Sequence, residues 1–448
     1  MSDRAVMRIL MFAYFYPPLG GAGVQRSLKF SKYLPDFGIV PSVISADSSA
    51  YTQDSSLLSE VPAKIEVMRL PHTPVLTRLM ALAPRRDRAR RVSAVPTPSR
   101  LDKTDSASRW RDRALRAFGT LQYPDDKTAW ARHAEQAALR LMEHTSIDLV
   151  YSSSPPVSAH LAAMRVARHA RVPWVADFRD LWTANPAYAA PGWRRAIDRR
   201  LESRLLAAAS GIVTVSERLA ATLADRTGPN VPVMSIPNGY DEADFAGVVV
   251  PTHASRGFCI VHAGTFYGHQ SPDSFLRGVE TLFEREPKMR ERLRIRFVGS
   301  VGSRFEPQLL AFEARYPRVL ERTGYVDHRQ ALAEMLAADA LLLVIGGQAE
   351  AAVGVMTGKL FEYLRAARPI LLLGAVDGEA AQLLRTVGAG AALDHAEPAR
   401  IAELLSNWMA GGAPVPVAER AIAYERRALA GRLGAFLATV HDRFHGRD

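Results

Sequence analysis

Cysteine is nearly absent from this sequence of 448 residues, since Cys259 is the single example. One thiol cannot form an intrachain disulfide or supply a cysteine cluster for zinc. Long apolar runs are also lacking: the run from Ile9 to Tyr16 ends at Pro17, short of a bilayer span or a signal peptide with a cleavage site. We therefore expect a cytoplasmic protein rather than a disulfide-rich secreted scaffold or an integral membrane protein.

Acidic residues are outnumbered, with 46 Asp and Glu against 57 Lys and Arg, and the formal net charge is +11. Residues 85–116 alone hold ten Arg and one Lys against four Asp, a net charge of +7. They lie in a stretch of little periodicity, about residues 83–120, which predicts a basic insertion with an amphipathic helix in its second half. A solvated loop is the simplest interpretation. The functional alternative is contact with an anionic membrane surface or acceptor, and nucleic acid is not expected as a partner.

Strands and helices alternate along the chain, which predicts parallel sheets in an α/β protein. A strand from residue 8 is followed by a glycine loop, a helix over 24–33 and a second strand over 37–46. Further strands are predicted at 147–156, 172–178, 211–216, 258–264, 294–300, 340–347, 369–375 and 390–394.

A segment rich in Pro, Asn and Gly, PNVPVMSIPNGYDEADF, interrupts this alternation at residues 229–245. We therefore predict two Rossmann-like domains, residues 1–245 and 246–425. Residues 426–448 have helical spacing and are expected to pack back on the first domain.

Glycines gather between the first strand and its helix, at Gly20, Gly21 and Gly23. Such glycines let the backbone approach a ligand, and the helix that follows offers free N–H groups to an anion. The spacing is not GxGxxG, and Asp47 is the one acid at the end of the second strand. The cluster alone is a weak sign of a nucleotide site.

Charged side chains follow the strand of VPWVADFRDLW, at Asp177, Arg179 and Asp180. Open α/β sheets bind ligands at this end of their strands. Three hydroxyl side chains, residues 152–154, lie at another strand end. We expect a functional site here, with an internal salt-bridged corner as the alternative.

The second half offers two candidate anion-binding segments. Gly264 and Thr265 follow a predicted strand, so their N–H groups could face a phosphate. Thr357, Gly358 and Lys359 begin a predicted helix, where the helix dipole and an ammonium group act together on a diphosphate.

Glu362 follows Lys359 by three residues, so the two side chains share one face of the helix. A cation for phosphate and a carboxylate for ribose hydroxyls would then point the same way. An ordinary surface ion pair is the alternative.

Seven segments together resemble glycosyltransferase family 4: FAYFYPPLGGAGVQRSLKFSKYL, VPWVADFRDLW, GIVTVSERLAATL, VMSIPNGYDEADF, HAGTFY, GYVDHRQALAEMLAADALLLV and KLFEYLRAARPIL. Their order matches the family over nearly the whole chain except the insertion. The resemblance implies a GT-B fold, in which two Rossmann-like domains face each other across a cleft and a C-terminal helix crosses back to the first. It also implies metal-independent sugar transfer from a nucleotide-sugar, with retention of configuration.

The resemblance assigns roles to particular positions. Glu362 falls on the carboxylate that binds the donor ribose, and Gly264 on the phosphate-binding glycine. Gly20 and Gly23 fall near the donor phosphates and Gly21 beside the reacting sugar. The loops near the nucleobase are those of Gly299, Ser300 and Val326.

The remaining role assignments are hypotheses within that framework. Lys359, Gly264 and Thr265 would bind the diphosphate. Arg179 would bind a phosphate or an acidic sugar group, and Asp177 or Asp180 would orient the acceptor hydroxyl. The acceptor would be a saccharide, a lipid-linked molecule or another small molecule, and no cofactor or metal is expected.

Three positions depart from the family pattern. Gly354 stands where the first of two glutamates is common, and Arg179 stands where many members have His. Residues 265–270 lack the usual Arg and Lys, for which Lys359 could substitute. These departures keep open a non-catalytic partner subunit, which would have the fold without the chemistry. A nucleotide-sugar epimerase is a further alternative, while a phosphorylase is disfavoured because no pyridoxal lysine segment is evident.

Overall fold

The computed structural model describes residues 6–74, 122–186, 188–251, 257–266, 268, 270–346 and 354–446. The chain divides into two compact units, here named unit 1 (residues 1–237 and 426–448) and unit 2 (residues 238–425). The division falls after Pro237, so helix α8 (Glu242–Phe245) belongs to unit 2, although the sequence-based boundary placed it at the end of the first domain. The predicted basic insertion of residues 83–120 lies outside the described residues.

Unit 1 contains a parallel sheet of seven strands in the order β3-β2-β1-β4-β5-β6-β7. The strands are β1 (Met7–Phe12), β2 (Ile39–Asp47), β3 (Val67–Pro71), β4 (Leu149–Ser154), β5 (Trp174–Phe178), β6 (Gly211–Thr214) and β7 (Val233–Ser235). The order reverses between β1 and β4, which pair in register Ile9 to Leu149. Ligands of open α/β sheets bind at such a reversal, beyond the carboxyl ends of the strands.

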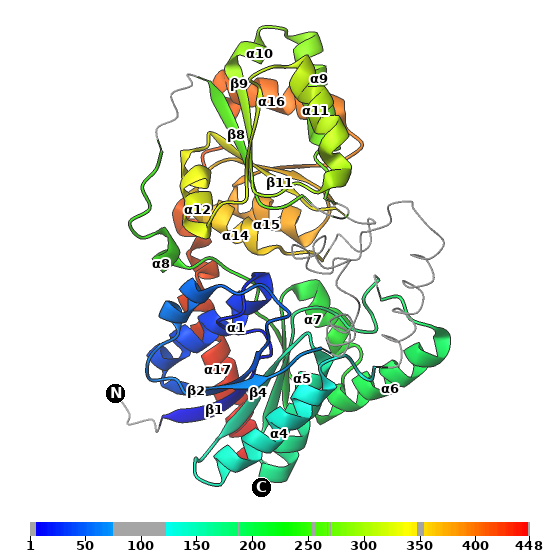
Figure 1. Cartoon of the computed structure of the whole chain (residues 1–448), viewed down its shortest axis with the longest axis vertical. Helices are drawn as coiled ribbons and strands as arrows, with labels where there is room; N and C mark the ends of the chain where they lie inside the picture. The colour runs from blue at the N-terminus through cyan, green and yellow to red at the C-terminus, as the bar shows by residue number, and fades with distance from the viewer. Residues whose placement is uncertain are drawn as a thin grey trace, which may run out of the picture. The chain divides into compact units, whose positions relative to one another are not determined.

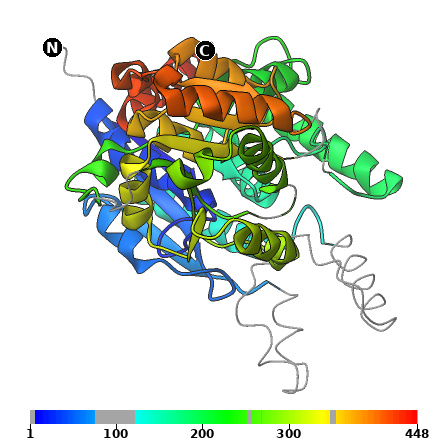
Figure 2. The same cartoon turned by 90° about the horizontal axis from the view of Figure 1, so that it is seen from above.

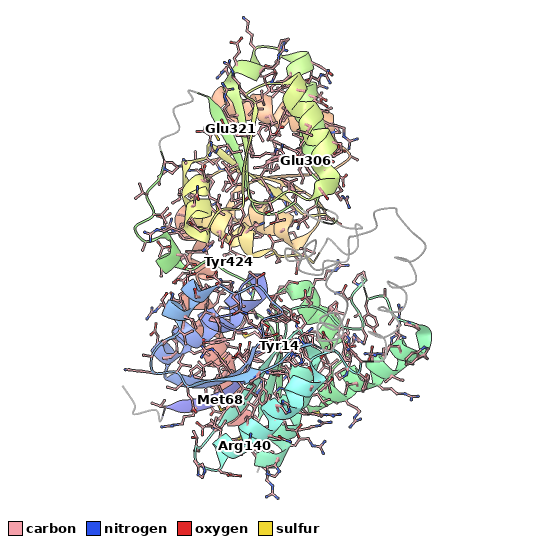
Figure 3. All side chains as sticks on the ribbon, viewed as in Figure 1. Tyr14, Met68, Arg140, Glu306, Glu321 and Tyr424 are labelled. Carbon is pink, nitrogen blue, oxygen red and sulfur yellow. The ribbon has the colours of Figure 1, made fainter. Side chains whose placement is uncertain are left out.

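The strands β4 and β5 are buried along their whole length, as a parallel sheet covered on both faces requires. The main helices of unit 1 are α1 (Ala22–Tyr33), α4 (Thr128–Met142), α5 (Val157–Ala170), α6 (Gly192–Ala208), α7 (Glu217–Ala224) and α17 (Arg426–His445). Tyr14 lies in the interior of this unit, whereas Arg140 of α4 lies at its surface (Figure 3).

The C-terminal helix α17 packs on α1 of unit 1, which confirms the predicted return of the chain to the first domain (Figure 1). Two glycines make this approach close. A β-carbon at Gly431 would lie 2.8 Å from the Phe37 ring, and one at Gly434 would lie 3.2 Å from Ile39. Larger side chains at these positions would push the helix away from the sheet.

Unit 2 contains a parallel sheet of six strands in the order β10-β9-β8-β11-β12-β13, so the same reversal occurs beside β8. The strands are β8 (Phe258–Ala263), β9 (Leu293–Val298), β10 (Leu320–Gly324), β11 (Ala340–Val344), β12 (Ile370–Leu373) and β13 (Gly390–Leu393). The helices are α8, α9 (Asp273–Arg285), α10 (Met289–Arg292), α11 (Glu306–Arg315), α12 (His328–Ala337), α14 (Gly358–Ala366), α15 (Glu379–Val387) and α16 (Pro398–Asn407).

Helix α16 lies beside α9 in both views of unit 2 (Figures 1 and 2). Gly278 permits this contact, because a β-carbon there would lie 2.4 Å from Ile401. Among the helices of the described residues, none is long and apolar enough to cross a membrane.

Candidate functional site

The glycine loop of unit 1 follows β1 and opens helix α1. Gly20 donates its N–H to the carbonyl of Thr52 at 2.9 Å, and a β-carbon there would lie 3.1 Å from Asp54. Gly21 precedes the helix with φ 94°, a left-handed conformation that favours glycine. Gly21 is exposed, so the start of α1 is open to solvent.

Arg179 ties this loop to the end of β4. Its Nε donates to the carbonyl of Ser154 at 3.0 Å and one terminal nitrogen donates to that of Pro155 at 2.8 Å, while the other donates to Gly23. Burial lowers the pKa of the guanidinium, and the nearby carboxylate of Asp177 opposes this. The predicted anion-binding role of Arg179 can use only the hydrogens that these carbonyls leave free.

Asp177 is fully buried and forms a bidentate ion pair with Arg26 of α1. Nε and Nη2 of Arg26 each donate at 2.9 Å, and the hydroxyl of Ser153 donates to the same carboxylate at 3.0 Å. Burial alone would raise the pKa of Asp177, but the guanidinium of Arg26 outweighs it and holds the pKa below its ordinary value. These contacts match the alternative of an internal salt-bridged corner.

Arg26 was not singled out from the sequence, where the helical pattern placed it with the polar residues of α1. It is nevertheless buried, because its side chain reaches into unit 1 and pairs with the buried carboxylate of Asp177 at the end of β5. Its Nη1 donates to the carbonyl of Ile236 at 2.8 Å. A single guanidinium thus joins α1, β5 and the segment that leads from unit 1 into unit 2, and no local sequence signal indicates this.

Asp180 differs from Asp177 because it is exposed and lines a pocket of about 280 Å³. The pocket is formed by Ser154, Pro155, Val157, Asp180, Leu181, Trp182, Asn185 and Tyr188. Desolvation by the surrounding protein raises the pKa of Asp180, while Arg179 lowers it. Apolar walls with a few polar groups are typical of small-molecule sites. This geometry favours Asp180 over Asp177 for any contact with an acceptor.

In unit 2, two glycines bring the ends of β8 and β9 together. Gly264 has φ 148° and Gly299 has φ 126°. The N–H of Gly264 donates to the carbonyl of Val298 at 2.7 Å, and a β-carbon on Gly299 would lie 2.4 Å from the Gly264 carbonyl oxygen. Both the backbone conformation and the space require glycine.

Lys359 places its ammonium group above Gly264, so close that a β-carbon on the glycine would lie 1.5 Å from Nζ. No hydrogen bond or ion pair to this ammonium is found among the described residues. Burial lowers its pKa, and the carboxylate of Glu362 opposes this. Helix α14 begins next to it at Gly358, and the buried hydroxyl of Thr357 finds no hydrogen-bond partner in the part of the chain that the structure describes. The cation, the helix N-terminus and the hydroxyl are all available to an anion.

Glu362 lies on α14 and accepts a hydrogen bond from His328, with 3.0 Å between Oε1 and Nε2. His328 is the first residue of α12, so this contact joins the start of α12 to the middle of α14. Sequence analysis did not identify His328, because α12 carries no motif that points to its partner.

The other predicted donor-site positions lie on loops of unit 2. Thr265 is exposed directly after β8, and the carbonyl of Ser300 accepts the N–H of Phe266 at 3.1 Å. Val326 follows β10 and packs partly on the core, next to the highly exposed Tyr325. The structure thus gathers Gly264, Gly299 and Lys359 in contact, while Val326 belongs to a separate loop.

Two histidines are buried near these strand ends. Nδ1 of His262 lies 2.9 Å from the carbonyl of Leu342, and its ring stacks on Phe266. In unit 1, Nδ1 of His160 lies 2.8 Å from the hydroxyl of Ser152. Within the described ranges, neither Nε2 has a hydrogen-bond partner. Burial lowers the pKa of each to about 3, so both rings are neutral at neutral pH.

Comparison with known proteins finds one family model that matches part of the chain. The sequence model of Glycosyltransferase Family 4 matches residues 81–244. No curated protein matches the chain at the level of sequence.

Solved structures share the fold over the whole chain. Sucrose-phosphate synthase from Thermosynechococcus elongatus has 10% identity, a TM-score of 0.61 and coverage of 97% of this chain and 99% of its own. HepE from Anabaena, solved with UDP, has 13% identity, a TM-score of 0.56 and coverage of 98% and 99%. The lipopolysaccharide outer core galactosyltransferase WaaB has 12% identity, a TM-score of 0.57 and coverage of 97% and 100%. The chain therefore has the GT-B fold, and its residues 81–244 match the model of Glycosyltransferase Family 4.

Proposed function

We propose that this protein is a glycosyltransferase that moves a sugar, most simply a hexose, from a nucleotide-sugar to an acceptor hydroxyl. The observation that carries the proposal is the unpartnered ammonium of Lys359 above Gly264, at the N-terminus of α14. A diphosphate would supply the missing anionic partner. Charge-assisted hydrogen bonds of this kind are the stronger ones in proteins.

The proposed reaction forms a bond between the acceptor oxygen and the anomeric carbon of the sugar. The bond from that carbon to the diphosphate oxygen breaks, and a diphosphate oxygen receives the acceptor proton. Lys359, the N–H groups of α14 and the hydroxyl of Thr357 stabilise the departing charge. The proposal includes retention of configuration and no metal ion.

UDP is the first nucleotide to test as part of the leaving group. HepE, with the same fold, is solved with UDP and also with UDP-glucose. In this proposal Glu362 binds ribose hydroxyls, and the loops of Ser300 and Val326 contact the base. The exposed position of Thr265 suits a further phosphate contact.

The acceptor site is proposed for unit 1, at the pocket beside Asp180. Asp180 would orient the acceptor hydroxyl, and Gly21 would lie beside the reacting sugar. The acceptor class stays open among saccharides, lipid-linked molecules and other small molecules. A role in polysaccharide biosynthesis, in the cytoplasm and peripheral to the inner face of the membrane, belongs to the same proposal and is suggested by the basic segment 85–116.

A non-catalytic partner subunit is the second candidate. Gly354 and Arg179 favour it, because each replaces a residue that family 4 enzymes commonly use. A nucleotide-sugar epimerase would bind the same nucleotide-sugar but would not transfer its sugar to an acceptor. Turnover with an acceptor by the purified chain separates transfer from both alternatives.

The first experiment is a thermal-shift and calorimetric series with UDP, GDP, ADP and TDP and their sugars. A ligand that binds only the native state must raise the unfolding midpoint. One preferred nucleotide, followed by its release from the matching sugar nucleotide, supports the proposed enzyme. Binding without turnover supports the partner subunit, and no response to any nucleotide contradicts the donor site.

A further inference from the structure

The outer face of helix α6 carries positive charge without compensation. Arg199, Arg200 and Arg204 are exposed, and no carboxylate of the described residues lies within ion-pair distance of them. Surface arginines commonly pair with acidic residues three or four positions away on the same helix. The positions of the two acidic residues of α6 therefore show why these arginines lack such a pair.

Both acids of α6 point into unit 1. Asp198 is buried and accepts from Nε of Arg194 at 2.7 Å. Glu202 is also buried, and Arg226 lies 2.7 Å from it. The negative charges are therefore neutralised inside the unit, and the charged side chains on the outward face of the helix are all arginines.

The same face exposes large apolar side chains. Trp193 is 55% exposed and Ile197 is 39% exposed. The positions 193, 197, 200 and 204 are separated by four, three and four residues, so they follow one side of the helix. Two apolar side chains, Trp193 and Ile197, and then two basic ones, Arg200 and Arg204, thus lie on one stripe of α6. The helix lies at the margin of unit 1, beside α5 (Figure 1).

We propose that this stripe of α6 docks on an anionic phospholipid bilayer. Trp193 and Ile197 would enter the headgroup boundary. Arg200 and Arg204 on the stripe, and Arg199 on the adjacent exposed side of the helix, would contact lipid phosphates. A nucleic acid would satisfy the charges but offer no apolar layer to the aliphatic side chain of Ile197. A bilayer surface satisfies both.

The neighbourhood of α6 supports this orientation. The carbonyl of Tyr188 accepts from Arg195 at 3.1 Å, and Tyr188 also lines the pocket that contains Asp180. Docking of α6 would bring that pocket close to the lipid surface. The carbonyl of Gln122 accepts from Arg194 at 3.0 Å, so the basic segment 85–116 precedes a residue anchored on this helix.

Co-sedimentation of the full chain with vesicles tests the proposal. The probes are vesicles of phosphatidylcholine alone and of phosphatidylcholine mixed with phosphatidylglycerol. The charge variant is Arg199→Gln/Arg200→Gln/Arg204→Gln. Its matched control is Arg132→Gln/Arg140→Gln/Arg168→Gln, which removes the same charge from exposed, unpaired arginines of α4 and α5.

The apolar variant is Trp193→Ala/Ile197→Ala, and Leu310→Ala/Ile422→Ala is its control because both side chains are similarly exposed in unit 2. We expect the wild type to bind only the anionic vesicles and to release them as salt rises. The α6 charge variant should bind about 10-fold or more weakly, since each Arg near an anionic surface contributes measurably. The apolar variant should also bind more weakly, and both controls should bind like the wild type.

Equal binding by the wild type and the α6 variants would overturn the proposal. An equal loss in the Arg132/Arg140/Arg168 control would also overturn it, because net charge alone would then explain binding. Nucleotide-induced thermal shifts of the same variants are measured in parallel. They report the donor site separately, so failure of docking and failure of the proposed function are distinguishable.

Discussion

The ammonium of Lys359 occupies the space where a side chain at Gly264 would begin, 1.5 Å from the position of its β-carbon. The two residues are far apart in sequence, on the end of β8 and the first turn of α14. The site therefore requires both the charge of Lys359 and the lack of a β-carbon at Gly264. Any side chain at 264 must displace the cation.

Gly264→Ala is therefore expected to weaken UDP binding by about 10-fold or more, as loss of a charge-assisted hydrogen bond would. It should also lower the free energy of unfolding by about 1 to 3 kcal/mol, because φ 148° is unfavourable for alanine. The control is Gly411→Ala, at φ 98° with nothing within 4 Å of the new β-carbon. Titration calorimetry measures the UDP affinity of both variants, and urea unfolding measures their stability. An equal loss of UDP affinity in the Gly411→Ala control would refute the steric explanation.

Lys359→Met should separate binding from stability. It removes the cation and keeps an apolar stem, so UDP affinity should fall by about 10- to 100-fold. Without ligand, the variant should be at least as stable as the wild type at neutral pH. Burial lowers the folded-state pKa of Lys359, so the charged form opposes folding below that pKa and this cost disappears as pH rises toward the unfolded value. Urea unfolding checks the sign, and a strongly destabilised variant would mark Lys359 as a structural residue.

Glu362→Gln should remove discrimination between ribose and deoxyribose. The wild type is expected to bind UDP better than 2′-deoxy-UDP by about 10-fold, because the carboxylate contact to the 2′-hydroxyl is lost in the deoxynucleotide. The variant should bind the two with similar affinity. Glu403→Gln, an exposed glutamate of α16, is the control. A preference for UDP that survives in Glu362→Gln would exclude the ribose role.

Most helices and strands of both units could be predicted, because the pattern of apolar residues within each element reflects which of its faces are buried. The fully apolar strand β11 and the helix α1 agree with their predicted positions, residues 340–347 and 24–33. Strand β10 was missed, since most of its residues are exposed and its pattern resembles a loop. Strand β3 was missed for a similar reason, as none of its residues is fully buried.

Only some residues of the candidate site could be recognised in the sequence. Glycines at strand ends and a lysine at a helix start are visible in sequence, because the backbone chemistry requires them in place. Arg26 and His328 are invisible, since each meets its partner only through the tertiary fold. A charged residue in an amphipathic helix is predicted to lie at the surface, and the buried partner of Arg26, Asp177, lies 151 positions further along the chain.

The buried histidines predict the pH dependence of stability. The pKa of each falls to about 3 in the folded protein, below the ordinary 6.5, so their contribution is complete above pH 6.5 and is lost as pH falls toward 3. Within this window each histidine should change the free energy of unfolding by about 1.4 kcal/mol per pH unit. His262→Asn keeps a donor for the carbonyl of Leu342 and should flatten the dependence of unit 2. Scanning calorimetry at several pH values checks this, with the exposed His133→Asn as control, and an unchanged slope in His262→Asn would contradict it.

The ion pair of Arg26 and Asp177 gives the sharpest test of a structural against a catalytic carboxylate. Asp177→Asn leaves the guanidinium buried without its anion, which should cost about 3 to 5 kcal/mol of the free energy of unfolding. Asp180→Asn, at the exposed pocket, should cost little stability. Urea unfolding of the two variants measures this difference directly.

Replacing both Arg26 and Asp177 distinguishes the contribution of the ion pair from the cost of leaving one charge buried alone. Arg26→Met/Asp177→Leu should recover much of the stability lost in either single variant, because desolvation of the charges is no longer needed. Its stability should also vary less with acid, since the folded-state pKa of Asp177 is depressed and its contribution is lost as pH falls through that value. If Asp177→Asn instead keeps wild-type stability and UDP affinity but abolishes transfer, the carboxylate is catalytic. If stability falls and the double variant restores it, Asp177 serves to anchor helix α1 and the glycine loop, and Asp180 is left as the carboxylate that can reach an acceptor.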